Sequence, residues 1–203
     1  MRITARNISF SPRLNSSSLV WASGFALLLV GLQFLPGELH RALWYQRDAV
    51  AGGEYWRLLS GNLVHLGWWH LALNVGALAL GIWVFYPARS PVGWIIAQFV
   101  CSFSSSLGLY LFSPEVGWCV GMSGALHGLL IIGALDWIRQ GERLGWLLLV
   151  VWMAKLAWEQ ANGAMPLSTA TIGAPVIIDA HLWGAVGGFL FAGGEAAVRK
   201  LRA

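Results

Sequence analysis

Residues 121–138 read GMSGALHGLLIIGALDWI, an apolar run that carries one serine, one histidine and a single charged residue. A later apolar segment begins Asp179-Ala-His181-Leu-Trp-Gly184. A run of about 17–25 apolar residues is what a helix needs to cross the hydrocarbon core of a bilayer. Ionisable side chains are costly at that depth, so a glycine-framed Ser123 and a histidine on a second apolar segment mark a candidate functional site.

The composition places the whole chain in the membrane class. Of its 203 residues, 57% are hydrophobic and 11% are charged, whereas soluble domains carry about 25% charged residues. Thirteen tryptophans fit aromatic belts at two membrane interfaces. The net charge of +4 is dispersed at the ends of apolar runs and not gathered in one stripe. This distribution indicates that the basic residues set the orientation of membrane helices, and no nucleic-acid partner is expected.

Six apolar runs are expected to cross the membrane as helices. They lie near residues 19–35, 64–85, 92–112, 121–138, 144–161 and 180–198. No clear small-residue cleavage site follows the first run, which we therefore expect to be a retained span and not a signal peptide. The sequence thus predicts an all-α membrane protein, a six-helix bundle with one domain over residues 1–203.

The basic residues predict the orientation of these spans. Those on one side of the six-span arrangement are Arg2, Arg6, Arg13, Arg89, Arg139, Arg143, Arg199, Lys200 and Arg202. Those on the other side are Arg41, Arg47 and Arg57, balanced by Glu38, Asp48 and Glu54. By the positive-inside rule, both termini are cytoplasmic. Ser123 and His181 then lie early in helices that enter from the outer face, so they share a depth.

These residue types suit acyl transfer. A serine hydroxyl becomes a nucleophile when a histidine takes its proton. His70 and Asn74 are four residues apart and share one face of a helix. Both side chains can donate hydrogen bonds, so the pair could hold the oxyanion of a tetrahedral intermediate.

The motifs occur in an order that resembles the rhomboid intramembrane serine proteases. They are Trp56-Arg57, His65…His70…Asn74, Gly121-x-Ser123-Gly124 and His181-x-x-Gly184-x-x-x-Gly188. The resemblance covers nearly the whole chain and implies a six-helix core. It implies Ser123 as nucleophile and His181 as general base, a dyad without an aspartate. It also implies an oxyanion hole made by His70, Asn74 and the Ser123 backbone amide, with Trp56 and Arg57 in an outer loop that packs sideways in the membrane.

One position departs from the family pattern. Rhomboids usually carry a tyrosine four residues after the nucleophile, where this chain has His127. The motif Ser-Gly-x-x-His-Gly is similar to the rhombosortase branch. That resemblance implies a bacterial inner-membrane enzyme whose active site opens to the periplasm. Its partners would be transmembrane substrates with a C-terminal Gly-Gly sorting tail (GlyGly-CTERM). Three roles stay open for His127, namely stacking on His181, bonding to a neighbouring helix, or acting as an alternative base.

Other functions are compatible with parts of this sequence. A general rhomboid protease of other transmembrane substrates and a non-catalytic rhomboid-like binder of membrane helices remain alternatives. A transporter is disfavoured because no internal repeat is found and the polar residues cluster at one depth. No metal and no cofactor are expected, since neither His-x-x-x-His nor His-Glu-x-x-His occurs.

Three further pairs of residues carry expectations. Cys101 and Cys119 either form a disulfide that pins the serine turn or remain free thiols. Lys155 and Glu159 are four residues apart on the fifth span and are expected to neutralise each other. Asp179 is expected to cap the last helix, with orientation of the His181 imidazole as the alternative.

Overall fold

The computed structural model describes residues 16–85, 89–165, 169–170 and 173–202. A long helix lies at each of the six predicted ranges. These helices are α1 (Ser16–Gln33), α5 (Trp68–Phe85), α6 (Pro91–Phe112), α7 (Ser123–Arg139), α8 (Arg143–Asn162) and α10 (Ile178–Leu201). Arg2, Arg6 and Arg13, which contribute to the predicted orientation, lie outside the described residues.

Two of these helices are long and apolar enough to cross a membrane by length and hydropathy among the described residues. They are α5, with 18 residues, and α6, with 22. The more polar helices α7, α8 and α10 carry buried side chains such as His127, Glu159 and His181. Spanning by all six helices, with both termini in the cytoplasm, stays a prediction.

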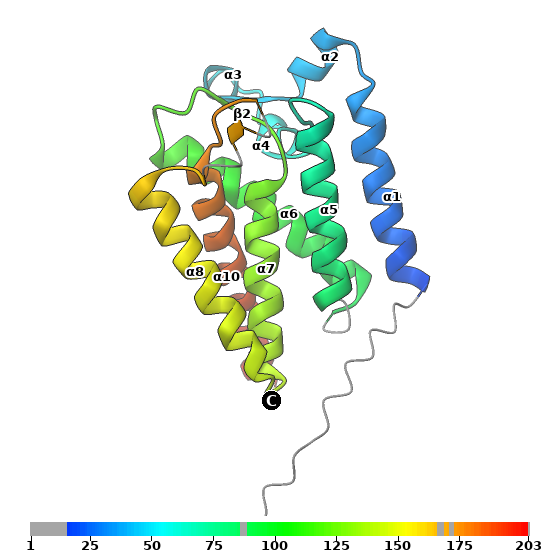
Figure 1. Cartoon of the computed structure of the whole chain (residues 1–203), viewed down its shortest axis with the longest axis vertical. Helices are drawn as coiled ribbons and strands as arrows, with labels where there is room; N and C mark the ends of the chain where they lie inside the picture. Colours follow the sequence, from blue (N-terminus) through cyan, green and yellow to red (C-terminus); the bar gives the residue numbers. More distant parts are fainter. Residues whose placement is uncertain (1–15, 86–88, 166–168, 171–172, 203) are drawn as a thin grey trace, which may run out of the picture.

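The long helices run side by side, and α7 lies at the centre of the arrangement (Figure 1). α7 packs against α5, α6, α8 and α10, while α1 packs against α5 and α6 at the periphery. Glycines allow the closest of these approaches. A Cβ on Gly184 would collide with the carbonyl of Gly124, and one on Gly188 would lie 2.5 Å from the carbonyl oxygen of Gly128. Small residues permit such backbone contact between helices in lipid.

This close approach gives a stability prediction. Gly184→Val should lower the free energy of unfolding by about 1–3 kcal/mol or more, because α10 would have to move away from α7. The measurement is thermal unfolding in detergent. Gly193→Val is the matched control, since Gly193 lies on the same helix with open space at its Cβ. Equal melting temperatures for the two variants would contradict the prediction.

The short elements gather at one end of the bundle, which we call the loop end (Figure 1). They are α2 (Gly37–Ala42), β1 (Tyr45–Gln46), α3 (Arg47–Ala51), α4 (Arg57–Ser60) and β2 (Trp118–Cys119). β1 and β2 pair antiparallel, with Tyr45 opposite Cys119. This pairing ties the loop between α1 and α5 to the segment that precedes α7.

Two arginines stabilise the loop end of the bundle through hydrogen bonds. Arg47 donates hydrogen bonds to three carbonyl oxygens at the C-terminus of α6, which satisfies groups that the helix leaves unpaired. Arg57 is buried and donates to the Glu54 carboxylate and to the carbonyl oxygens of Arg41 and Trp44. Arg57 is therefore a structural residue of the loop end, whereas its neighbour Trp56 is exposed.

A cluster of ion pairs lies at the end of the bundle opposite the loop end. Arg89 donates to both carboxylate oxygens of Asp136 on α7 and to Glu195 on α10. Asp136, the one charged residue of the run at 121–138, is thereby neutralised. Arg139 adds a bond to Asp136 and another to the carbonyl oxygen of Ala192. The cluster joins α7 and α10 at the end away from the loops.

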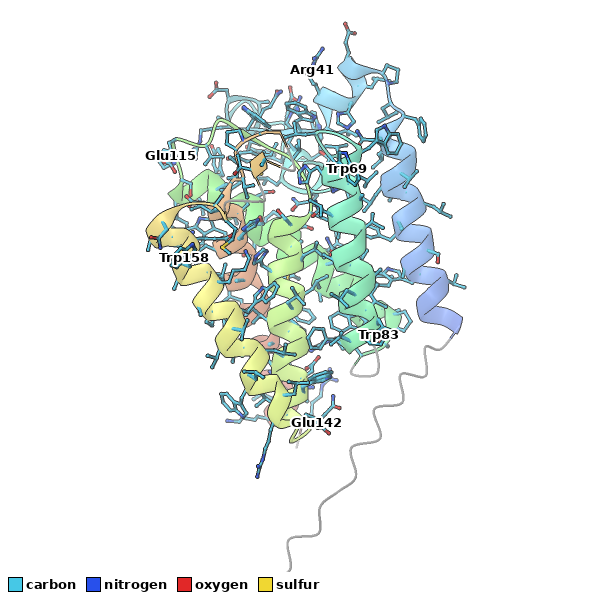
Figure 2. The ribbon with its side chains drawn as sticks, viewed as in Figure 1. Arg41, Trp69, Trp83, Glu115, Glu142 and Trp158 are labelled. Atoms are coloured by element: carbon cyan, nitrogen blue, oxygen red, sulfur yellow. The ribbon has the colours of Figure 1, made fainter. Side chains whose placement is uncertain are left out.

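Exposed tryptophans lie toward both ends of the bundle. Figure 2 shows Trp69 and Trp158 nearer the loop end and Trp83 nearer the other end. All three rings are exposed. This distribution fits the two interfacial belts expected from the composition.

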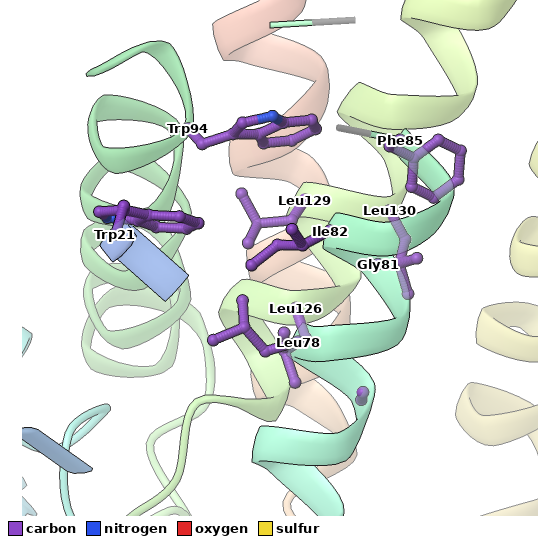
Figure 3. Close-up of a pocket in the computed structure, with 10 residues that line it drawn as sticks. Trp21, Leu78, Gly81, Ile82, Phe85, Trp94, Leu126, Leu129 and Leu130 are labelled. Carbon is purple, nitrogen blue, oxygen red and sulfur yellow. The ribbon is translucent and has the colours of Figure 1, made fainter. Parts of the chain in front are cut away.

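The apolar core joins α1, α5, α6 and α7. Trp21, Leu78, Ile82, Trp94 and Leu129 surround a small cavity of about 20 Å³ (Figure 3). The space is about that of a single water molecule, and its lining offers almost no polar atom. We therefore treat it as a dry packing defect and not as a ligand site.

Candidate active site

A tight turn presents Ser123 at the start of α7. Gly121 has φ +101°, a conformation that favours glycine, and a Cβ there would lie 2.5 Å from the His70 ring. Met122 then occupies the N-cap position of α7. The backbone amides of the first turn have no partner within the helix, so Ser123 lies beside hydrogen-bond donors and the positive end of the helix dipole. Gly124 faces α10, since its Cβ would lie 2.6 Å from the Ala180 carbonyl oxygen.

The structure brings Ser123 and His181 into contact. Ser123 Oγ lies 3.0 Å from His181 Nε2, and the histidine is buried on the first turns of α10. The hydroxyl donates to Nε2 when the other ring nitrogen, Nδ1, carries the proton. Nδ1 lies 3.0 Å from Oε2 of Glu159, which accepts that proton's hydrogen bond. Ser123, His181 and Glu159 thus form a connected chain across α7, α10 and α8.

Glu159 was missed as a neighbour of His181 in the sequence. Its expected pairing with Lys155 is present, since Lys155 Nζ lies 2.7 Å from Glu159 Oε1. The second carboxylate oxygen, however, faces the histidine of another helix. Its depth was the available signal, because a carboxylate inside a membrane segment is a functional candidate by default. The site therefore departs from a serine–histidine pair without an acidic residue.

His127 packs face to face with His181. The ring centroids are 4.0 Å apart and the planes differ by 13°. His127 Nδ1 lies 2.7 Å from the Ser123 carbonyl oxygen and donates to it, while Nε2 lies 2.8 Å from Lys155 Nζ and accepts from it. Of the three roles left open, this geometry favours stacking and bonding to a neighbouring helix. Both nitrogens are engaged away from the serine hydroxyl, which disfavours the role of base.

His70 and Asn74 project from α5 toward the same cavity. Both are buried, and Asn74 Nδ2 donates to the His70 carbonyl oxygen at 2.8 Å. That bond uses one of the two N–H groups of the Asn74 amide and leaves the second N–H available to donate to another group. Within the described part of the chain, His70 Nδ1 and Asn74 Oδ1 have no hydrogen-bond partner. His65, fully buried in the preceding loop, packs edge-on against His70 with centroids 5.0 Å apart and supports its ring.

The site lies in one cavity of about 320 Å³. Its walls come from α5, α7, α8 and α10 and from the segments at 118–120 and 175–177. The lining is mostly apolar, and the polar side chains on it are His70, Asn74, Ser123, His127, Lys155, Glu159 and His181. A mainly apolar pocket of a few hundred Å³ with a few convergent polar groups is typical of a small-molecule or peptide site.

Three of these residues could be considered for a metal ion. His127, Glu159 and His181 have ligand atoms within 4.8 Å of one another. The Lys155 ammonium, however, already bonds to both Glu159 and His127. A cation would have to displace this ammonium and break the contact between His181 Nδ1 and Glu159. Stacked imidazoles also present parallel edges, whereas a metal needs converging ligands. The arrangement favours a hydrogen-bonded network, and the absence of a metal stays a prediction.

Cys101 and Cys119 are both free thiols, the second of the two alternatives. Cys101 lies within α6, where it packs against Gly128 of α7. Cys119 belongs to β2 and is held opposite Tyr45. Burial raises the pKa of the Cys119 thiol to about 12, which leaves it protonated and weakly reactive.

The expectation for Asp179 was wrong. Ile177, not Asp179, occupies the N-cap position of α10. The Asp179 carboxylate accepts a hydrogen bond from the Ser113 hydroxyl at 2.5 Å, just after the end of α6. The partner of His181 is Glu159, so Asp179 serves to tie α10 to α6.

Comparison with known proteins gives the family. The family model described as "Rhomboid domain" matches residues 52–195. The chain belongs to the rhomboid family. This match includes every residue of the site described above. The family and the apolar helices α5 and α6 are consistent with a membrane location.

Three relatives are similar over different parts of their length. The "Putative rhomboid protease YdcA" of Bacillus subtilis (strain 168) is 30% identical over 146 residues, which is 70% of this chain and 67% of that protein. The "Rhomboid-like protease 5" of Toxoplasma gondii is 30% identical over 156 residues, 74% of this chain and 17% of that protein. The "Rhomboid protease GluP" of Bacillus subtilis (strain 168) is 29% identical over 102 residues, 48% of this chain and 18% of that protein. The chain thus spans less than a fifth of two of the relatives.

Proposed function

We propose that this chain is an intramembrane serine protease that cleaves membrane-anchored proteins. The observation that carries the proposal is the 3.0 Å contact between Ser123 Oγ and His181 Nε2 at the wall of the cavity. The two residues are 58 positions apart in the sequence. A nucleophile in hydrogen-bond reach of a base, which is itself oriented by a third group, has the geometry of covalent acyl transfer.

The proposed reaction uses the groups that line the cavity. Ser123 Oγ attacks the scissile carbonyl carbon while its proton passes to His181 Nε2. The C–N bond then breaks, and the same proton goes to the leaving amine. Water, activated by His181, hydrolyses the acyl-enzyme and frees the serine. We propose that the oxyanion that forms in each half of the reaction accepts hydrogen bonds from His70, Asn74 and the Ser123 backbone amide.

We further propose that the substrates carry a C-terminal Gly-Gly sorting tail, as the resemblance to the rhombosortase branch implies. The motif Ser-Gly-x-x-His-Gly at 123–128 supports this narrower assignment. His127 fills the space beside His181 with a ring that is held from both edges. An extended glycine strand, which lacks side chains, suits a cleft bounded by such fixed rings. The proposed location is the bacterial inner membrane, with the cavity open to the periplasm.

The test is a reporter with a Gly-Gly, membrane-helix and basic tail, co-expressed with the wild type or with Ser123→Ala. We expect a cut beside the glycines that is lost in the variant, read by mass spectrometry of the new C-terminus. A reporter in which Leu-Leu replaces Gly-Gly is the matched substrate control.

Each outcome assigns a different function. Cleavage of both reporters, dependent on Ser123, would indicate a general rhomboid protease and remove the tail specificity. If the folded wild type cuts neither of these reporters nor a general rhomboid substrate, the proposed protease is wrong. The non-catalytic binder of membrane helices would then be favoured.

A further inference from the structure

We infer that Glu159 is a positioning residue that extends the Ser123–His181 pair into a serine–histidine–glutamate arrangement, with Lys155 holding the carboxylate. This inference rests on the proposed function and deepens it. It makes α8 part of the catalytic machinery, whereas the sequence placed no catalytic residue on that helix.

The carboxylate of Glu159 is fixed at both oxygens. Oε2 lies 3.0 Å from His181 Nδ1, and Oε1 lies 2.7 Å from Lys155 Nζ. The Glu159 side chain is 2% exposed, so water does not compete for either oxygen. A buried carboxylate without a partner is strongly unfavourable, and the Lys155 ammonium supplies the opposite charge. The two bonds leave the group no freedom to rotate.

This fixed acceptor selects one tautomer of His181. A neutral imidazole carries its proton on either nitrogen, but only the form protonated at Nδ1 leaves Nε2 free to accept from Ser123. Glu159 Oε2 accepts from Nδ1–H and so favours that form. When Nε2 takes the serine proton, the carboxylate also lies beside the new imidazolium and stabilises it. Both effects act on the rate of the chemical step and not on substrate binding.

Lys155 links this carboxylate to the ring that covers His181. Its ammonium bonds to Glu159 on one side and to His127 Nε2 on the other, at 2.8 Å. His127 in turn stacks on His181. The catalytic ring is therefore held at its edge by Glu159 and on its face by His127, and one ammonium fixes both supports. The groups facing His181 are Ser123 and His127 from α7, Glu159 and Lys155 from α8, and His70 from α5.

The first test is Glu159→Gln. We expect kcat to fall by about 10²-fold or more with KM changed less than about threefold, because the substitution affects the transition state and the tautomer of His181. Glu195→Gln is the matched control. It removes a carboxylate that also pairs with a base on another element, at the end of the bundle away from the site. Its kcat should equal that of the wild type.

A second variant separates positioning from charge neutralisation. The double variant Lys155→Met/Glu159→Gln removes both charges and is compared with Lys155→Met, because both variants lose the bond from Lys155 to His127. If Glu159 serves only to neutralise Lys155, the two variants should have the same kcat. If Glu159 positions His181, the double variant folds, since no unpaired buried charge remains, yet its kcat falls below that of Lys155→Met. Equal kcat values for these two variants, or a single Glu159→Gln variant with wild-type kcat, overturn the inference. Melting temperatures of all variants are measured alongside.

The failure of this inference differs from that of the proposed function. Serine-dependent cleavage is established first, by comparing wild type with Ser123→Ala. If the folded wild type does not cleave, the proposed protease activity is wrong, and the role of Glu159 is wrong with it. Cleavage by wild type that survives in Glu159→Gln removes only the role of Glu159.

Discussion

His181→Ala is expected to lower kcat for peptide cleavage by on the order of 10⁴-fold or more, whereas His127→Ala should keep a measurable fraction of it. The two rings lie 4.0 Å apart and nearly parallel, so position alone does not distinguish them. Their hydrogen bonds do. Only His181 presents a ring nitrogen to Ser123 Oγ, because both nitrogens of His127 bond to the Ser123 carbonyl and to Lys155.

The loss in His127→Ala should be about 3–10-fold. Stacked aromatic pairs are worth about 0.5–1.5 kcal/mol beyond their buried area, and this variant also frees Lys155 from one partner. The measurement is the rate of reporter cleavage by purified variants in detergent. His40→Ala is the control, since His40 accepts a hydrogen bond from Trp44 at the loop end and does not line the cavity. If His127→Ala proved the less active of the two, the assignment of His181 as base would be wrong.

The long helices were predictable from hydropathy, and their ends were less so. The range predicted at 64–85 begins at Trp68 in the structure, because residues 61–67 form the loop that holds buried His65. The run predicted from 121 begins at Ser123, because Gly121 has a positive φ and cannot continue into a helix. The short elements at the loop end were not predicted. They depend on pairing between distant segments, as between Tyr45 and Cys119.

Contacts in the candidate site that follow from a shared depth along the helices could be predicted from the sequence. Contacts that depend on how a helix is rotated about its own axis could not. Ser123 and His181 could be paired because both lie early in helices that enter from one face. Glu159 lies 22 residues before His181, and its contact depends on how α8 is turned about its axis. Since α8 is apolar on most of its surface, no sequence periodicity specifies that rotation. Arg47 was missed for a similar reason, because its partners are backbone carbonyls of α6, which carry no sequence signal.

Removing the donors on α5 gives the second large expected effect. Asn74→Ala and His70→Ala should each lower kcat by about 10²–10³-fold, which is typical for the loss of one oxyanion-hole donor. Both side chains are buried and line the cavity with Ser123. The Asn74 amide has a second N–H that its bond to the His70 carbonyl oxygen does not use, and His70 Nδ1 has no partner in the described structure. Such atoms are costly unless a ligand satisfies them, so their retention fits a role that appears when substrate is bound.

The measurement is kcat and KM for each variant, together with binding of a peptide aldehyde that forms a covalent adduct on Ser123. Loss of a donor should weaken the adduct, which carries the oxyanion, and leave KM nearly unchanged. Asn162→Ala is the matched control, because Asn162 on α8 makes the same local bond, to the carbonyl oxygen four residues earlier, without facing the cavity. A raised KM with unchanged kcat would assign His70 and Asn74 to substrate binding.

The effects of the two sets of variants on kcat can be separated because the substituted residues lie on different helices. The proposed oxyanion donors His70 and Asn74 belong to α5, and the groups that hold His181 belong to α7 and α8. Ser123 stands between the two sets at the N-terminus of α7. A Glu159→Gln/Asn74→Ala double variant should therefore lose the product of the two single effects, since the residues share no contact. Losses well below that product would mean that a shift of α7 couples the two sides of the cavity.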